Sequence, residues 1–268
     1  MKHSSVITHF LTPTYRTLSM LSGIVLEEPE VFTQDSASTD DIIEAAIAHN
    51  ELVFVRAAVG LVLFECVILR DFTKAADVIL KYPSFFEVLN NRYASAVEMN
   101  VFFLAGLTSF QLARETRETH WTEKGTNALA AYENWLLRNR PNHEHKCTIR
   151  LQLTAGAYPI HSQLCFFFTL ADLLLKAECH QLKGETDAAI DAYESSILSA
   201  HENKFVHNEA IACEMAAHFF GNIGKIRRTR GMIQKSHDLY LEWGAKTKAG
   251  SVIELLNLRY LDETVFTD

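Results

Sequence analysis

Three short stretches of this sequence hold residue types that catalytic or ligand-binding sites use. The first, Gly221-Asn-Ile-Gly-Lys225, resembles part of a phosphate-binding loop. Such a loop has four residues between its glycines and a serine or threonine after its lysine, so that backbone amides ring the phosphates and the hydroxyl reaches the metal. Here the glycines are closer together and Ile226 follows the lysine. The stretch therefore predicts a helix turn and no nucleotide site.

The other two stretches contain histidine beside a carboxylate or a thiol. His143-Glu-His145 suggests a metal site, but alternate residues in a loop with no third ligand nearby favour a solvated turn. Cys179-His180 suggests a nucleophile and its base. Adjacent residues on a helix point about 100° apart and cannot hydrogen-bond as such a pair, which favours a buried thiol. We therefore expect no enzyme, no metal and no cofactor.

A fourth stretch is strongly basic. It holds four cations in six residues, namely Lys225, Arg227, Arg228 and Arg230. The stretch begins a predicted helix, where partial positive charge makes cations mildly unfavourable. Salt bridges to Glu209 and Glu214 of the preceding helix, or solvation, are one explanation. The other is an acidic partner surface.

These residues belong to two predicted helical hairpins that repeat at a fixed interval. The first hairpin spans Leu173 to Ala200 and turns at Gly184. The second has helices at 209–220 and 226–243 around a turn at 221–224, and Gly244 closes it. Gly184 and Gly224 are 40 positions apart. A period of this size is typical of tetratricopeptide-like arrays, in which each helix buries one stripe.

Apolar residues recur at three and four positions along the second helix of each hairpin. In the first hairpin the stripe is Ala188, Ala189, Ala192, Tyr193, Ile197 and Ala200, with Asp187, Asp191 and Glu194 outside it. In the second it is Ile226, Thr229, Ile233, Ser236, Tyr240 and Trp243, widened by Met232 and Leu239. Small residues in such a stripe let neighbouring helices approach closely.

Upstream, the pattern predicts further helices and one linker. Proline and glycine place a helix at 12–23, and polar residues at 27–41 form a linker that caps a helix at 42–49. Helices at 52–69 and 72–81 form another hairpin, in which Arg70 and Ala75 correspond to Gly184 and Ala189. Two more are expected at 93–113 and 121–138. We therefore expect an all-α solenoid at 42–268, preceded by an N-terminal helix and linker at 1–41.

Residues 147–170 fit two patterns. Ile149, Leu151 and Leu153 alternate with polar residues as in a strand, yet Ile149, Leu153 and Gly156 also share one face of a helix. A lone strand would leave its backbone groups unpaired, so we favour helix. The apolar run from Cys165 to Leu175 continues as a helix that is too short to cross a bilayer.

Composition narrows the class of protein further. The net charge of −8 argues against nucleic acid as the main partner. The most apolar run, Leu52 to Leu69, contains Arg56 and Glu65, which favours a buried helix over a membrane span. No apolar run near Met1 resembles a signal peptide. Five cysteines without a CxxC pair are expected to be buried thiols of a cytoplasmic protein.

Most of the chain resembles the helical region, similar to tetratricopeptide repeats, that lies between the ATPase and GAF modules of large hybrid sensor kinases. The motifs that carry this resemblance are Leu-Leu-Lys-Ala-Glu178, Lys-Gly184 with Ala-Ala-Ile-Asp-Ala-Tyr193, Asn-Glu-Ala210, Glu-Met-Ala-Ala-His-Phe219 and Tyr240-Leu-Glu-Trp-Gly-Ala-Lys246. Weaker matches lie at 70–76, 102–107 and 141–146. In the family the loop at 141–146 passes almost directly into the next helix, whereas here residues 147–170 intervene.

Two functions are compatible with these patterns. The first is a scaffold for a protein or peptide partner, with a groove lined by four exposed side chains, Glu178, Gln181, Glu214 and His218. Its two carboxylates would favour neutral or basic segments, while an acidic ligand would bind at Lys225 to Arg230. The second, implied by the resemblance, is a regulatory fragment that transmits signals between the kinase or ATPase modules of a signalling protein. The sequence leaves open whether the chain is a free-standing adaptor or part of a longer product.

Overall fold

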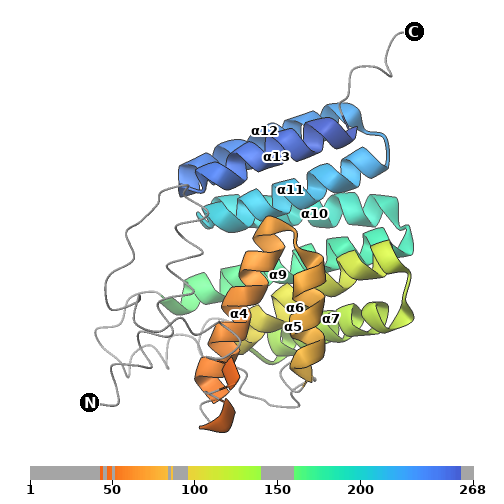
Figure 1. Cartoon of the computed structure of the whole chain (residues 1–268). Helices are drawn as coiled ribbons and strands as arrows, with labels where there is room; N and C mark the ends of the chain where they lie inside the picture. Colours follow the sequence, from red (N-terminus) through yellow and green to blue (C-terminus); the bar gives the residue numbers. More distant parts are fainter. Residues whose placement is uncertain are drawn as a thin grey trace, which may run out of the picture. The chain divides into compact units, whose positions relative to one another are not determined.

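The computed structural model describes residues 43–44, 47–49, 52–83, 86, 96–139 and 160–260. All regular structure in these ranges is helical, which confirms the all-α class (Figure 1). The predicted helix at 12–23, the linker at 27–41 and the segment at 140–159 lie outside the described residues. The described helices fall into two compact units, whereas we expected one domain from residue 42 onward.

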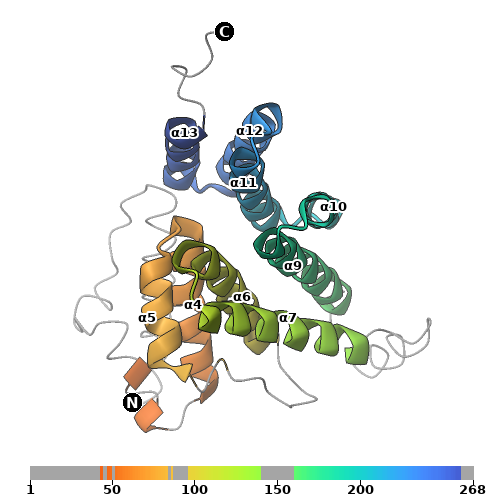
Figure 2. The same ribbon diagram turned by 90° about the vertical axis from the view of Figure 1, so that its right-hand side faces the viewer.

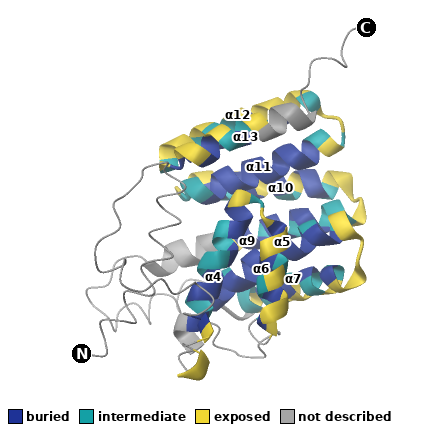
Figure 3. Ribbon diagram, viewed as in Figure 1, coloured by how far each residue is buried: buried dark blue, intermediate teal, exposed yellow. Residues whose placement is uncertain are grey.

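The first unit combines an early hairpin with the last three helices of the chain. Helices α4 (Leu52–Leu69) and α5 (Phe72–Lys81) pack as a hairpin with the bounds that the sequence predicts. Helices α11 (Val206–Asn222), α12 (Ile226–Trp243) and α13 (Lys246–Tyr260) pack against one another. Residues 208–220 of α11 are buried without interruption, so this helix is the centre of the unit (Figure 3).

The second unit contains four described helices, which lie between these segments in the sequence. They are α6 (Ala96–Thr116), α7 (Thr119–Asn139), α9 (Ile160–Lys183) and α10 (Thr186–Glu202). Helices α6 and α7 pair with each other and both pack against α9, which also pairs with α10 (Figure 2). A Cβ on Gly106 of α6 would lie 2.7 Å from Leu175 and 3.0 Å from Ala128, because three helices converge there.

Four of the described turns share one backbone geometry, which also occurs at Lys204 (61°), where the Phe205 N–H donates to the Ala200 carbonyl at 3.0 Å. In each, a residue with positive φ follows the helix, and the next backbone N–H donates to the carbonyl five residues back. The positive-φ residues are Arg70 (59°), Gly184 (75°), Gly224 (72°) and Gly244 (92°). The hydrogen bonds run from Asp71 to Cys66 (2.9 Å), Glu185 to His180 (2.9 Å), Lys225 to Phe220 (2.8 Å) and Ala245 to Tyr240 (2.8 Å). This arrangement satisfies carbonyls that a helix end would otherwise leave unpaired.

Packing after these turns also repeats. The residue five positions beyond each turn is small and 0% exposed, as at Ala75, Ala189, Thr229 and Ala249. Arg70 and Ala75 thus have the same turn geometry and burial as Gly184 and Ala189. Two buried hydrogen bonds also repeat at the 40-residue spacing of Gly184 and Gly224. Ser196 donates to the Leu170 carbonyl and Ser236 donates to the Ala210 carbonyl, both at 3.0 Å.

The apolar stripes of α10 and α12 lie where the spacing predicts. Tyr193, Ile197, Ile233 and Tyr240 are buried, while Asp187, Asp191 and Glu194 are exposed. Several bounds differ from expectation. Helix α6 ends at Thr116 where we expected 113, α7 spans 119–139 where we expected 121–138, and α11 spans 206–222 where we expected 209–220. Helix α9 begins at Ile160, and α13 follows Gly244, where we placed no helix. None of the described helices combines the length and apolar character that a membrane crossing requires.

Candidate functional site

The four predicted groove residues lie on α9 and α11, but three of them are not exposed. Relative exposure is 1% for Glu178, 4% for Glu214 and 7% for His218, so the prediction of a solvent-facing groove there is wrong. Gln181 is half-buried. The physical reason is that each carboxylate has cationic and hydroxyl partners supplied by other helices. These partners make the two acids part of the packed interior.

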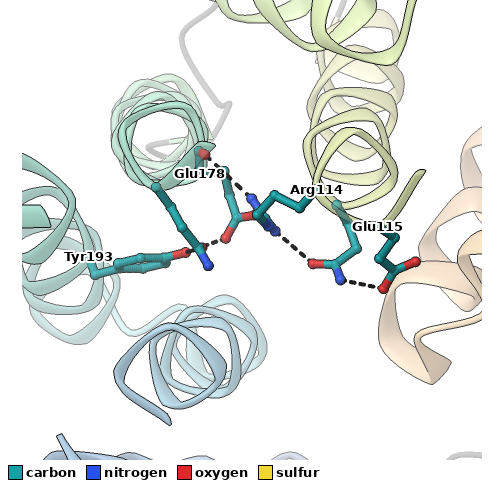
Figure 4. A network of polar contacts seen from close by, with 6 residues as sticks. Arg114, Glu115, Glu178 and Tyr193 are labelled. Carbon is teal, nitrogen blue, oxygen red and sulfur yellow. Dashed lines mark hydrogen bonds and ion pairs between the residues drawn. The ribbon is translucent and has the colours of Figure 1, made fainter. Parts of the chain in front are cut away.

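Glu178 is the centre of a polar cluster in the second unit (Figure 4). One carboxylate oxygen accepts from the Tyr193 hydroxyl on α10, and the other pairs with the Arg114 guanidinium on α6. Arg114 Nη1 also donates to the Glu178 backbone carbonyl at 3.4 Å. The Tyr193 hydroxyl lies 2.9 Å from the Gln181 side-chain amide. One acid thus joins three helices.

The cluster extends from Arg114 toward the surface. Arg114 Nη2 donates to Gln111 Oε1 at 2.6 Å, and Gln111 Nε2 donates to Glu115 Oε1 at 2.6 Å. Burial alone would lower the pKa of the Arg114 guanidinium, but the charge and hydrogen bond of Glu178, together with Tyr193 and Glu115, outweigh it and the pKa is raised. Arg114 therefore stays charged, as a buried carboxylate requires of its partner.

Glu214 is the centre of a chemically similar cluster in the first unit. Its Oε2 accepts from the Tyr240 hydroxyl on α12 at 2.8 Å, and its Oε1 pairs with Lys248 Nζ on α13 at 2.7 Å. Lys248 is 4% exposed, and its Nζ lies 5.5 Å from the centroid of the Tyr240 ring. Burial, followed by the charge of Glu214, raises the pKa of Tyr240 well above its ordinary value, so the hydroxyl remains a donor.

The basic stretch behaves differently, because all four cations are exposed, Lys225 as the N-cap residue of α12 and the three arginines in its first turns. We call Lys225, Arg227, Arg228 and Arg230 the basic patch. Glu209 and Glu214, which we considered as its salt-bridge partners, instead pair with Lys235 (2.8 Å) and Lys248 (2.7 Å). Within the described residues, no carboxylate is paired with the side chains of Lys225, Arg227 and Arg230. Arg228 lies over the Phe220 ring, 5.1 Å from its centroid.

No protein-family model matches this chain, and no curated protein or solved structure is significantly similar to it. The resemblance to sensor-kinase helical regions therefore stays an expectation from the sequence.

The residues considered for catalysis are placed as follows. Cys179 is buried, and His180 Nδ1 lies 2.5 Å from Glu185 Oε2 across the turn. Burial raises the pKa of Cys66 to about 11 and that of Cys213 to about 12, so both are protonated thiols at neutral pH. Among the described residues, no group of three His, Cys, Asp or Glu is arranged to hold a metal ion. His143-Glu-His145 lies outside the described ranges.

Sequence reasoning missed the partners of the two buried acids. Arg114 lies 64 residues from Glu178, and Lys248 lies 34 residues from Glu214, so no local spacing connects them. The tyrosines did carry a usable signal. The hydroxyl of a tyrosine in an apolar stripe needs a buried hydrogen-bond acceptor. The preceding helix of each hairpin carries a carboxylate within reach of that hydroxyl, Glu178 for Tyr193 and Glu214 for Tyr240.

Proposed function

We propose that this chain is a non-catalytic helical-repeat scaffold that binds an acidic segment of a partner protein at the basic patch. The observation that carries the proposal is the contrast between the interior acids and the surface cations. Glu178, Glu209 and Glu214 are committed to partners within the fold. Lys225, Arg227 and Arg230 are exposed and pair with no carboxylate of the described residues.

The repeated turns support the scaffold part of the proposal. Hairpins joined by one recurring turn, with small buried residues at equivalent positions, are the units from which α-solenoids are stacked. Such arrays bind partners through exposed side chains of their helices. Helix α12 offers such side chains, because its stripe from Thr229 to Tyr240 is buried while the cations of the basic patch beside it are exposed.

Calorimetric titration with an Asp/Glu-rich peptide tests the proposal. We expect saturable binding that weakens as salt is raised, since exposed charges are screened. Replacing the three arginines together by glutamine should abolish binding. The matched control replaces three exposed lysines elsewhere, Lys183, Lys204 and Lys246, by glutamine and should retain it. Equal losses in both variants, or no binding by the native chain, would refute the proposal.

A further inference from the structure

The basic patch is arranged as two short rows on the surface of α12. Lys225 and Arg228 are three residues apart, as are Arg227 and Arg230, and residues at this spacing are neighbours on a helix. Arg228 is held against the Phe220 ring. Three of the four cations are arginines, whose planar donors bind a tetrahedral or planar oxyanion through two parallel hydrogen bonds. The patch thus offers several forked donors within about one turn.

Gly231 lies beside these cations, four residues after Arg227 and three after Arg228. It is exposed in the interior of α12, and a Cβ built on it would meet nothing within 4 Å. Packing therefore gives no reason for a glycine, which is unfavourable inside a helix relative to alanine. A glycine does permit another backbone to approach the helix closely. The exposed backbone at Gly231 lies next to the arginines of the basic patch. This arrangement would let a bound peptide cross α12 at Gly231.

We propose that the basic patch binds a phosphorylated serine or threonine in a partner segment whose backbone passes over Gly231. This inference rests on the proposed function and names its ligand. A phosphate group concentrates nearly two negative charges and three acceptor oxygens in one place, whereas each carboxylate brings one charge. Arg227 and Arg230, which pair with no carboxylate of the described residues, together with Lys225 provide clustered donors that match a phosphate group better than a carboxylate.

Three peptides of one sequence test the ligand, carrying serine, phosphoserine or aspartate at the central position. We expect the phosphopeptide to bind at least about tenfold more tightly than the aspartate peptide. Replacing Arg227, Arg228 and Arg230 by lysine keeps the charge but removes the forked donors. This variant should lose most of the preference for phosphate while still binding the aspartate peptide.

The outcomes separate the two proposals. Equal affinity for the phosphoserine and aspartate peptides, unchanged in the lysine variant, would overturn the phosphate inference and leave the acidic-segment function standing. Failure of both peptides would overturn both. Binding to phosphatidylserine vesicles with no phosphopeptide binding would also overturn the inference, because the ligand would then be a lipid surface.

Gly231→Ala tests the path of the peptide. We expect it to raise the melting temperature and to weaken phosphopeptide binding, a combination that a purely structural glycine does not give. Gly250→Ala is the matched control, since Gly250 is also exposed within a helix with open space around it. It should raise the melting temperature and leave binding unchanged. Unchanged affinity in Gly231→Ala would contradict the proposed path.

Discussion

At the scale of single residues, the interior is organised by two buried acids that each bind a tyrosine and a cation. Glu178 uses Tyr193 and Arg114, and Glu214 uses Tyr240 and Lys248. A buried ion pair adds little net stability compared with apolar residues, but removing one partner leaves an uncompensated charge. The clusters therefore determine which helices pack together more than how stable the fold is.

Lys248→Met is expected to lower the free energy of unfolding by about 3–5 kcal/mol, because Glu214 then keeps only the Tyr240 hydroxyl. Combining it with Glu214→Gln should recover much of the loss, since no buried charge remains. Urea unfolding of the single and double variants measures both effects. If the losses of the two single variants simply added in the double variant, the two side chains would not interact.

His207 supplies a pH dependence in the first unit. Its ring lies 5.5 Å from the Trp243 ring and 6.5 Å from the Phe64 ring, and burial lowers its pKa below the ordinary 6.5. The unfolded chain thus binds this proton more readily, so the contribution of His207 to stability is present above about pH 6.5 and is lost as the pH falls below it.

We expect His207→Gln to reduce the loss of stability between pH 7.5 and pH 5.5. The comparison of variant and native chain isolates the contribution of His207 from that of every other titratable group. Thermal unfolding at several pH values measures it, and His201→Gln, at an exposed position, is the control. Parallel pH profiles for the native chain and His207→Gln would show that burial of this ring is not linked to stability.

The errors at this scale have a common cause. A carboxylate in a helical sequence ordinarily marks the solvent face, and for Asp187, Asp191 and Glu194 that inference is correct. For Glu178 and Glu214 it is wrong, because their partners come from helices far along the chain. A charged side chain is buried only when a partner from elsewhere in the fold pairs with it, and the spacing of residues within one helix gives no information about such a partner.

At the scale of helices, prediction worked where turn chemistry and periodicity agree. The bounds of α4, α5 and α12 coincide with those expected, because Arg70, Gly224 and Gly244 interrupt long apolar patterns. Helix α13 was missed. Gly250 lies inside it, and its buried residues Lys248, Ala249 and Val252 include a lysine. A lysine predicts a surface position, and only the ion pair with Glu214 explains its burial.

The close packing of α6, α7 and α9 gives a test at this scale. Gly106→Ala should lower the free energy of unfolding by about 1–3 kcal/mol, because the new Cβ would overlap Leu175, which is fully buried. Gly250→Ala should instead raise it by about 0.5–1 kcal/mol. Chemical denaturation of both variants measures the difference. A neutral Gly106→Ala would mean that Leu175 can shift without cost.

At the scale of the whole molecule, the chain builds two compact units, one from α4, α5 and α11–α13 and the other from α6, α7, α9 and α10. Each unit contains one of the two acids that bind a tyrosine and a cation, and each of these acids joins three helices of its unit. Helices that pack cooperatively within one unit unfold together in local unfolding events. The free energy of such local unfolding can differ from one unit to the other. Substituting the cation that pairs with each acid therefore tests the local stability of one unit at a time.

Hydrogen exchange measured by mass spectrometry compares the units directly. Lys248→Met should accelerate exchange in α11, α12 and α13, and Arg114→Met should accelerate it in α6, α9 and α10, because each substitution strands a buried carboxylate among those helices. Lys183→Gln, at an exposed position, serves as the control and should change little. If either variant accelerated exchange equally in every described helix, the chain would open as one cooperative block, and the acids would stabilise the whole molecule instead of their own units.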